Sequence, residues 1–177
     1  ENLQARHRPY GQLVDPVFGT PESEELIGYS RCGDAAIWTG HLLAAEAFRY
    51  KAEPSSGNLE AVKRTLEVIR QMIDVTGEDL LARCAFPANS PYAAWILSEE
   101  ASHGYYSGIV NGEQWLWIGN TSRDQYLGVF FGLMIPIAQI PAAAIASLLL
   151  RGNLLIAAAS TLVSNPLTYG PLYYFAY

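Results

Sequence analysis

The sequence predicts an all-α protein, in which an αα-hairpin is followed by a hydrophobic helical hairpin. Two neighbouring segments between residues 34 and 77 carry apolar residues at helical spacing. Two long uncharged runs come after them. All 17 acidic and all but one of the 11 basic residues precede residue 125, and Arg151 is the remaining base. We therefore divide the chain into residues 1–126 and residues 127–177.

The first region begins with an irregular lead-in, residues 1–33, which is rich in Pro, Gly and polar side chains. Asp34 then stands where a helix N-cap is expected. The segment "DAAIWTGHLLAAEAFRYKA" predicts a helix whose apolar face holds Ile37, Leu42, Ala45 and Phe48. The turn-forming sequence "EPSSGN" ends it.

The second helical segment, "NLEAVKRTLEVIRQMIDVTG", has the clearest amphipathic pattern in the chain. Charged residues separate its apolar positions, and Gly77 is well placed to end the helix. Those apolar positions are Leu59, Val62, Leu66, Ile69 and Ile73. Two helices joined by a short polar link form an αα-hairpin, which needs further neighbours to bury its apolar faces.

Residues 78–124 mix aromatic, Gly, Ser and Asn residues without a long period, which is typical of long loops. One short β-hairpin is expected in "YYSGIVNGEQWLWIG", because Asn111-Gly112 is a strong tight-turn signal. Three of the 4 tryptophans lie in this region. A long structured loop in a helical protein is more often functional than decorative.

The second region contains two uncharged runs. The run from Leu127 to Leu150 is long enough to cross a hydrocarbon core of about 30 Å at a helical rise of about 1.5 Å per residue. A polar break at residues 151–153 follows. Asn165-Pro166 divides the last run, so that it fits a broken helix, a re-entrant segment or a buried core helix.

Residues 1–133 resemble part of an (α/α) six-hairpin toroid, the architecture of many glycosidase-like proteins. The resemblance is carried by "DAAIWTGHLLAAEAFRY", "VIRQMIDVTG", "LLARCAF" and "WLWIGNTSRDQYLGVFFGL". It implies loops around a cavity that often binds sugars. About one and a half of six hairpins are present, so this chain alone cannot close a toroid.

The last 50 residues are similar to the bacterial membrane family called domain of unknown function 2062. They share its Pro-containing first span, its Arg-x-Asn turn and its Asn-Pro-x-Thr segment. The matching positions are Arg151, Asn153, Asn165, Pro166, Thr168, Pro171 and Tyr174. The resemblance implies a bacterial inner-membrane location and no known biochemical role. The two resemblances meet at "GVFFGL", which leaves open a natural fusion, a misassembled gene or an artificial join.

Two carboxylates are candidates for catalysis at a sugar site. Asp124 lies in the aromatic-rich loop and can act as general acid or base, with Asp34 as the second carboxylate. The alternatives are structural, because Asp34 suits an N-cap and Asp124 can pair with Arg123 or cap the following helix. Whether the protein is an enzyme stays open.

Five residues are candidates for substrate binding. Tryptophans can stack on sugar faces, and arginines can bind a carboxylate or phosphate; the alternatives are core packing and structural ion pairs. Trp115 and Trp117 would share one side of a strand. The candidates are Trp38, Arg83, Trp115, Trp117 and Arg123.

The sequence gives no reason to expect a metal, a cofactor or nucleic acid. His41 and His103 lack partners at metal-ligand spacing, and the basic residues form no patch. Cys32 and Cys84 allow one disulfide or two free thiols.

The expected partners are a lipid bilayer and a glycan ligand. Gly128 and Gly132 form a GxxxG pair that permits helix-mediated oligomers in lipid. We therefore expect a membrane-associated helical protein of unknown biochemical role, with a carbohydrate-binding or glycoside-hydrolase-like fragment as the alternative.

Overall fold

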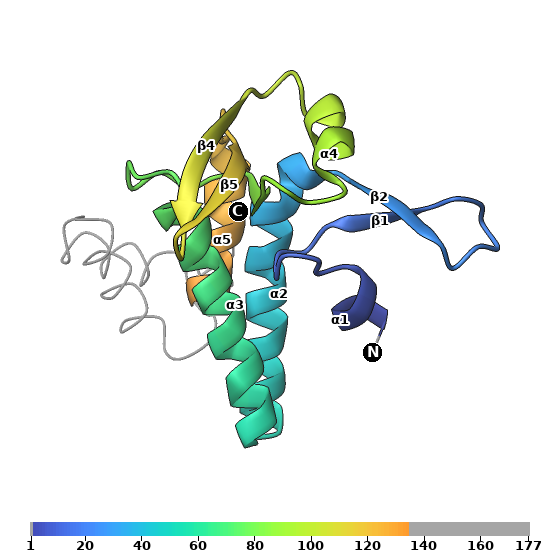
Figure 1. The fold of residues 1–177 in the computed structure, drawn as a ribbon. Helices are drawn as coiled ribbons and strands as arrows, with labels where there is room; N and C mark the ends of the chain where they lie inside the picture. Colours follow the sequence, from blue (N-terminus) through green and yellow to red (C-terminus); the bar gives the residue numbers. More distant parts are fainter. Residues whose placement is uncertain (1, 135–177) are drawn as a thin grey trace, which may run out of the picture.

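The computed structural model describes residues 2–134. A long helical hairpin forms its centre, with a third helix along one side and a small sheet over one end (Figure 1). The predicted hydrophobic helical hairpin lies outside the described residues from position 135 onward. The elements are α1 (Asn2–Arg6), β1 (Asp15–Phe18), β2 (Leu26–Ser30), the 3-10 turn η1 (Cys32–Asp34), α2 (Ala35–Ala52), α3 (Ser56–Asp74), β3 (Cys84–Pro87), α4 (Ala93–Glu99), β4 (Tyr105–Val110), β5 (Glu113–Ile118) and α5 (Arg123–Met134).

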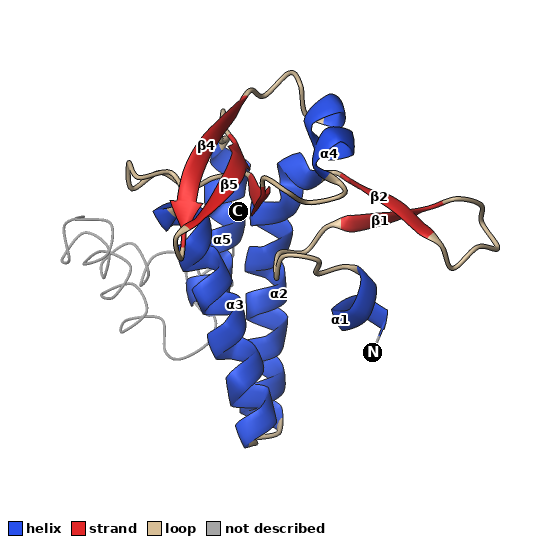
Figure 2. Ribbon diagram, in the orientation of Figure 1, coloured by secondary structure: helices blue, strands red, loops and turns tan. Residues whose placement is uncertain are grey.

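The all-α, toroid-like prediction is wrong, because the protein contains two antiparallel sheets (Figure 2). Strands β1 and β2 pair within the segment predicted to be an irregular lead-in. The second sheet has the order β3-β5-β4. Strands β1 and β3 have four residues each, too few for alternation to separate a strand from a loop. The helical hairpin therefore packs against a sheet and α5, and no second toroid hairpin follows it within the described residues.

The expected αα-hairpin is confirmed as α2 and α3. Helix α3 buries Val62 and Ile69, as its pattern predicts. The apolar face predicted for α2 is wrong in part, because Leu42 is buried but Ala45 and Phe48 are exposed. Helix α2 packs between α3 and α5, and its buried positions are small residues and leucines: Ala36, Gly40, Leu43, Ala44 and Ala47.

The β-hairpin predicted around Asn111-Gly112 is also confirmed. Both turn residues have positive φ angles, 51° and 83°, which a two-residue type I′ hairpin turn requires. The turn sets the register that places Tyr106 opposite Trp117. It thereby builds one wall of the groove described below.

Helices α2 and α5 make an unusually close contact through three glycines. A Cβ atom on Gly40 would collide with the backbone carbonyl of Gly128, and one on Gly132 would collide with the carbonyl of Gly40. Small residues are what allow two helix backbones to approach this closely. The GxxxG pair thus faces α2 of the same chain, and its expected role in oligomers stays a prediction.

A side chain from α5 caps the start of α2. Asp34 occupies the expected N-cap position, but its side chain makes no capping hydrogen bond. Instead, the amide of the fully buried Gln125 accepts a hydrogen bond from the Ile37 backbone N–H at 2.9 Å and donates one to Asp34 Oδ1 at 3.1 Å. The free N–H groups of a helix start are therefore satisfied from a residue far along the chain.

We expect Gln125→Ala to lower the free energy of unfolding by about 1–3 kcal/mol, because the partly buried Ile37 N–H would lose its acceptor. Thermal unfolding of the full chain in mild detergent measures the change. Gln114→Ala removes an exposed glutamine from β5 and serves as the control. Equal melting temperatures for the two variants would contradict the capping role.

A buried ion pair fixes the N-terminal segment to the helical hairpin. Arg8 Nη1 lies 3.2 Å from Glu46 Oε1, and the two side chains are 7% and 4% exposed. Thr65 on α3 donates to the other Glu46 oxygen at 2.5 Å and accepts from Arg8 Nη2 at 2.9 Å. Burial lowers the pKa of Arg8 and the carboxylate of Glu46 opposes that shift. The triad joins three parts of the fold.

The boundary predicted at residues 126 and 127 falls inside α5. Gly128, Val129 and Gly132 belong to the predicted hydrophobic run, yet they are buried against the first region. Among residues 2–134, no helix combines the length and apolar character that crossing a bilayer requires.

Candidate functional site

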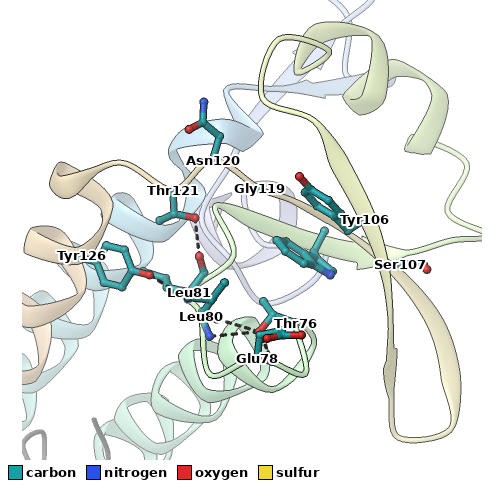
Figure 3. Close-up of a pocket in the computed structure, with 11 residues that line it drawn as sticks. Thr76, Glu78, Leu80, Leu81, Tyr106, Ser107, Gly119, Asn120, Thr121 and Tyr126 are labelled. Carbon is teal, nitrogen blue, oxygen red and sulfur yellow. Dashed lines mark hydrogen bonds between the residues drawn. The ribbon is translucent and has the colours of Figure 1, made fainter. Parts of the chain in front are cut away.

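A groove with a volume of about 620 Å³ lies beside the second sheet. One wall comes from β4 and β5, another from the loop after α3, and the third from the segment between β5 and α5 (Figure 3). The lining residues are Thr76, Glu78, Leu80, Leu81, Tyr106, Ser107, Trp117, Gly119, Asn120, Thr121 and Tyr126.

Two aromatic rings form the sheet wall of this groove. Tyr106 and Trp117 are directly paired across β4 and β5, and their rings stack with centroids 4.6 Å apart at an interplanar angle of 27°. Gly119 leaves room for the Tyr106 ring, because a Cβ there would press against it. Tyr106 is 54% exposed and therefore presents an open ring face to a ligand.

The opposite wall is held in place by hydrogen bonds to the backbone of Leu81. Thr121 Oγ1 donates to the Leu81 carbonyl at 2.5 Å, and the Tyr126 hydroxyl accepts from the Leu81 N–H at 3.4 Å (Figure 3). Thr76 Oγ1 accepts from the N–H groups of Glu78 and Leu80 at 3.2 and 3.3 Å. These bonds tie the loop after α3 to the start of α5 and make the groove preformed.

The polar groups available to a ligand lie at the rim. Glu78, Ser107 and Asn120 are exposed residues in the lining. Asn120 takes a left-handed backbone conformation with φ 51°, which asparagine tolerates better than most residues. The carboxylate of Glu78 and the amide of Asn120 can accept and donate hydrogen bonds to a polyhydroxylated ligand. The Ser107 side chain, next to Tyr106 on β4, points to the other face of the sheet.

Arg83, a predicted substrate-binding residue, is buried below the groove. Its guanidinium donates to the carbonyls of Asn120 and Gly33 at 2.9 and 2.7 Å, and to Ser122 Oγ at 2.7 Å. It therefore positions the segment that carries Asn120 from beneath. Arg123, the second predicted arginine, is exposed in the first turn of α5 and does not line the groove.

Neither of the two candidate carboxylates belongs to the groove lining. Asp34 Oδ1 is 3.8 Å from Arg83 Nη1 and accepts from Gln125. A hydrogen bond from Ser122 lowers the pKa of Asp124, which keeps that exposed carboxyl ionised. An ionised carboxyl is in the wrong state for a general acid. Catalysis by either residue stays a prediction.

The three candidate tryptophans separate into different environments. Trp115 and Trp117 share one side of β5, as predicted, but Trp115 is 9% exposed and packs against Tyr10 in the core. Trp117 is half-buried at the groove, and its indole Nε1 is buried without a hydrogen-bond partner within the described residues. Trp38 lies far from this wall, exposed on α2 beside His41.

Trp117 is the one lining residue among the sequence-based candidates, and the residues that were missed include Tyr106, Asn120 and Glu78. A signal for Tyr106 was available, because the Asn111-Gly112 turn with a two-residue loop fixes the register that pairs it with Trp117. No comparable signal exists for Glu78, whose place depends on tertiary packing of the loop after α3.

Neither cysteine is a candidate nucleophile. Cys32 and Cys84 are both free thiols buried in one apolar cluster, so the disulfide considered from sequence is not formed. A hydrogen bond with Cys32, together with burial, raises the pKa of the Cys84 thiol well above its usual value. That thiol stays protonated at neutral pH. Within residues 2–134, no group of His, Cys, Asp and Glu side chains is arranged to hold a metal ion.

Comparison with known proteins gives one family match. No curated protein and no solved structure matches the chain. The matching segment starts at Asn120 in the groove and includes all of α5, together with the residues that follow the described part. Residues 120–177 match the family "Uncharacterized protein conserved in bacteria", which is domain of unknown function 2062, as the sequence motifs of the C-terminal part predict.

Proposed function

We propose that this protein is membrane-associated and that its first 134 residues form a folded unit held beside the bilayer. The observation that carries this proposal is the absence of charge from residues 127–150 and 154–177, two runs separated by a polar break at Arg151. Residues 127–134 of the first run belong to α5 of the folded unit, so the part proposed to enter lipid begins after Met134. A charged side chain at the centre of a membrane-spanning segment costs about 2.5–3.5 kcal/mol. A run without charged residues can therefore enter the bilayer without that cost. Arg151 weakly favours a cytoplasmic side for the break between the runs.

Alkaline carbonate extraction tests this proposal. We expect the full chain, expressed in a bacterium, to stay in the membrane pellet after washing, because carbonate removes peripheral proteins and leaves inserted ones. A chain ending at Met134 should move to the supernatant. Recovery of the full chain in the soluble fraction would refute membrane association.

A second candidate function, glycan binding, is favoured by the groove. Its support is the exposed Tyr106 ring stacked on Trp117, with Glu78 and Asn120 at the rim. Aromatic rings offer the flat apolar surface on which a sugar ring can lie, while the rim supplies hydrogen bonds to its hydroxyls. We propose binding and not hydrolysis, because Glu78 is the one carboxylate in the lining, whereas glycoside hydrolysis typically uses two.

We expect Tyr106→Ala to weaken glycan binding about tenfold, which corresponds to about 1.4 kcal/mol of lost stacking. Tyr105→Ala is the matched control, because Tyr105 is similarly exposed on the same strand but is absent from the lining. The measurement is a glycan array on the detergent-solubilised full chain, followed by titration of any hit. If no glycan binds, or if both variants bind equally, this candidate function fails.

A further inference from the structure

An apolar row of side chains covers the outward surface of α2 and α5. On α2, Trp38, His41, Ala45 and Phe48 recur at intervals of three or four residues and are all exposed. On α5, Leu127 and Phe131 are exposed four residues apart. The exposed fractions of the large apolar members are 46% for Trp38, 54% for Phe48, 60% for Leu127 and 44% for Phe131. We call these six residues the outer row.

The outer row is continuous across the two helices. The ring centroids of Trp38 and His41 are 5.6 Å apart, and those of His41 and Phe131 are 5.1 Å apart. His41 joins the two helices, and its Nδ1 lies 2.8 Å from the Ile37 carbonyl, to which an Nδ1–H can donate. Contiguous exposed apolar surface of this kind is uncommon on soluble proteins and marks an interaction surface.

The position of the outer row on the chain indicates what it contacts. The row borders the seam where α2 and α5 cross at Gly40, Gly128 and Gly132. Phe131 is three residues before the end of α5 at Met134, a rise of about 5 Å along a helix. The next charged residue along the chain is Arg151. If the chain enters a bilayer after Met134, the outer row is brought to that same surface.

The charges around the outer row fit a lipid headgroup region. Helix α2 exposes Arg49 and Lys51 at its last turn, and its one carboxylate, Glu46, is buried in the ion pair with Arg8. Acidic side chains lie at the helix ends: Asp34 and Glu53 flank α2, and Asp124 lies in the first turn of α5. Tryptophan and other aromatic residues concentrate at the membrane interface, and nearby basic residues bind anionic lipids.

We propose that the outer row of α2 and α5 lies in the interfacial layer of the membrane, so that the folded unit rests on the lipid through these helices. The proposal rests on the membrane association proposed above. It adds a second contact with lipid, made by the first region, and it fixes which face of the folded unit is turned to the membrane. The groove, on the sheet, stays open to ligands in water.

Site-specific fluorescence quenching tests the orientation on the full chain. We would label Phe48→Cys and Leu127→Cys with bimane, and would label Glu67→Cys on the exposed side of α3 as the control. The native thiols are buried, and the unsubstituted chain reports any background labelling. Circular dichroism confirms that each variant folds. The chain is reconstituted in vesicles of phosphatidylethanolamine and phosphatidylglycerol.

Two quenchers separate the outcomes. We expect lipids with a nitroxide near the headgroup end of the acyl chain to cause a severalfold loss of fluorescence at positions 48 and 127 but not at 67, and iodide to do the reverse. Iodide access at all three positions in vesicle-bound protein would overturn the proposed orientation and leave membrane association standing. Protection at 48 and 127 from both quenchers would also overturn it, because residues 135–177 or a second copy would then cover the row. Failure to float with vesicles would refute the membrane association itself.

Discussion

Replacing Glu46 with alanine is expected to lower the free energy of unfolding by about 3–5 kcal/mol, the largest effect of any single substitution considered for this protein. The substitution leaves the Arg8 guanidinium, only 7% exposed, without its counter-charge. Thr65 also loses the carboxylate to which its hydroxyl donates. The penalty of an unpaired buried charge exceeds the net contribution of the intact ion pair, which is why removing one partner is so damaging.

Thermal unfolding of the full chain in mild detergent measures this effect. For a protein of this size about 1 kcal/mol corresponds to roughly 2–4 °C, so we expect a fall of about 6–20 °C. Glu60→Ala, which removes an exposed glutamate from α3, is the control and should change stability by less than about 0.5 kcal/mol. A shift at Glu46 no larger than that control would show that the triad is not buried in solution.

The second large effect is expected from Gly40→Ala. The new methyl group would collide with the backbone of Gly128 and Val129, which cannot rotate away as a side chain can. The helices must therefore separate, at a cost of about 3 kcal/mol, the upper end of what overpacking usually costs, because the clash is with backbone atoms. The higher helix propensity of alanine, worth about 1 kcal/mol, opposes only part of this loss.

The same substitution at a glycine with free space provides the control. A Cβ on Gly57, in the first turn of α3, has no atom within 4 Å, so Gly57→Ala should leave stability unchanged or raise it by up to about 1 kcal/mol. The two variants have identical chemistry and opposite expected signs. Destabilisation of equal size at both positions would show that the α2–α5 seam is not the cause.

The sequence predicts some elements of this fold because their signals are local. The α3 helix follows from apolar residues spaced three and four apart, and the β4–β5 turn follows from Asn111-Gly112, whose backbone angles few other pairs adopt. The face of α2 could not be predicted in the same way. Its contacts with α5 come from residues about ninety positions later, and small residues such as Gly40 carry no apolar periodicity.

Only part of the candidate site could be predicted, because long-range contacts decide which side chains are covered. Trp117 lines the groove, whereas Trp115, two residues earlier on the same strand, is buried in the core. Sequence places them on one side of β5 but does not show which of them a neighbour covers. Arg83 has the charge expected of a ligand-binding residue, but its guanidinium makes three hydrogen bonds within the protein. Those bonds form through tertiary contacts, so the sequence does not show them.

The hydrogen bond from Ile37 to Gln125 has a consequence for the order of events during synthesis. The two residues are 88 positions apart, so α2 leaves the ribosome before Gln125 can bind its first turn and before α5 can pack against Gly40. Contacts of such long sequence separation form late in folding, because the intervening chain must first be ordered. Until α5 emerges, α2 and α3 form a hairpin that is uncovered on one side. Because α5 contains the first residues of the hydrophobic run, the folded unit is completed only when synthesis has reached that run.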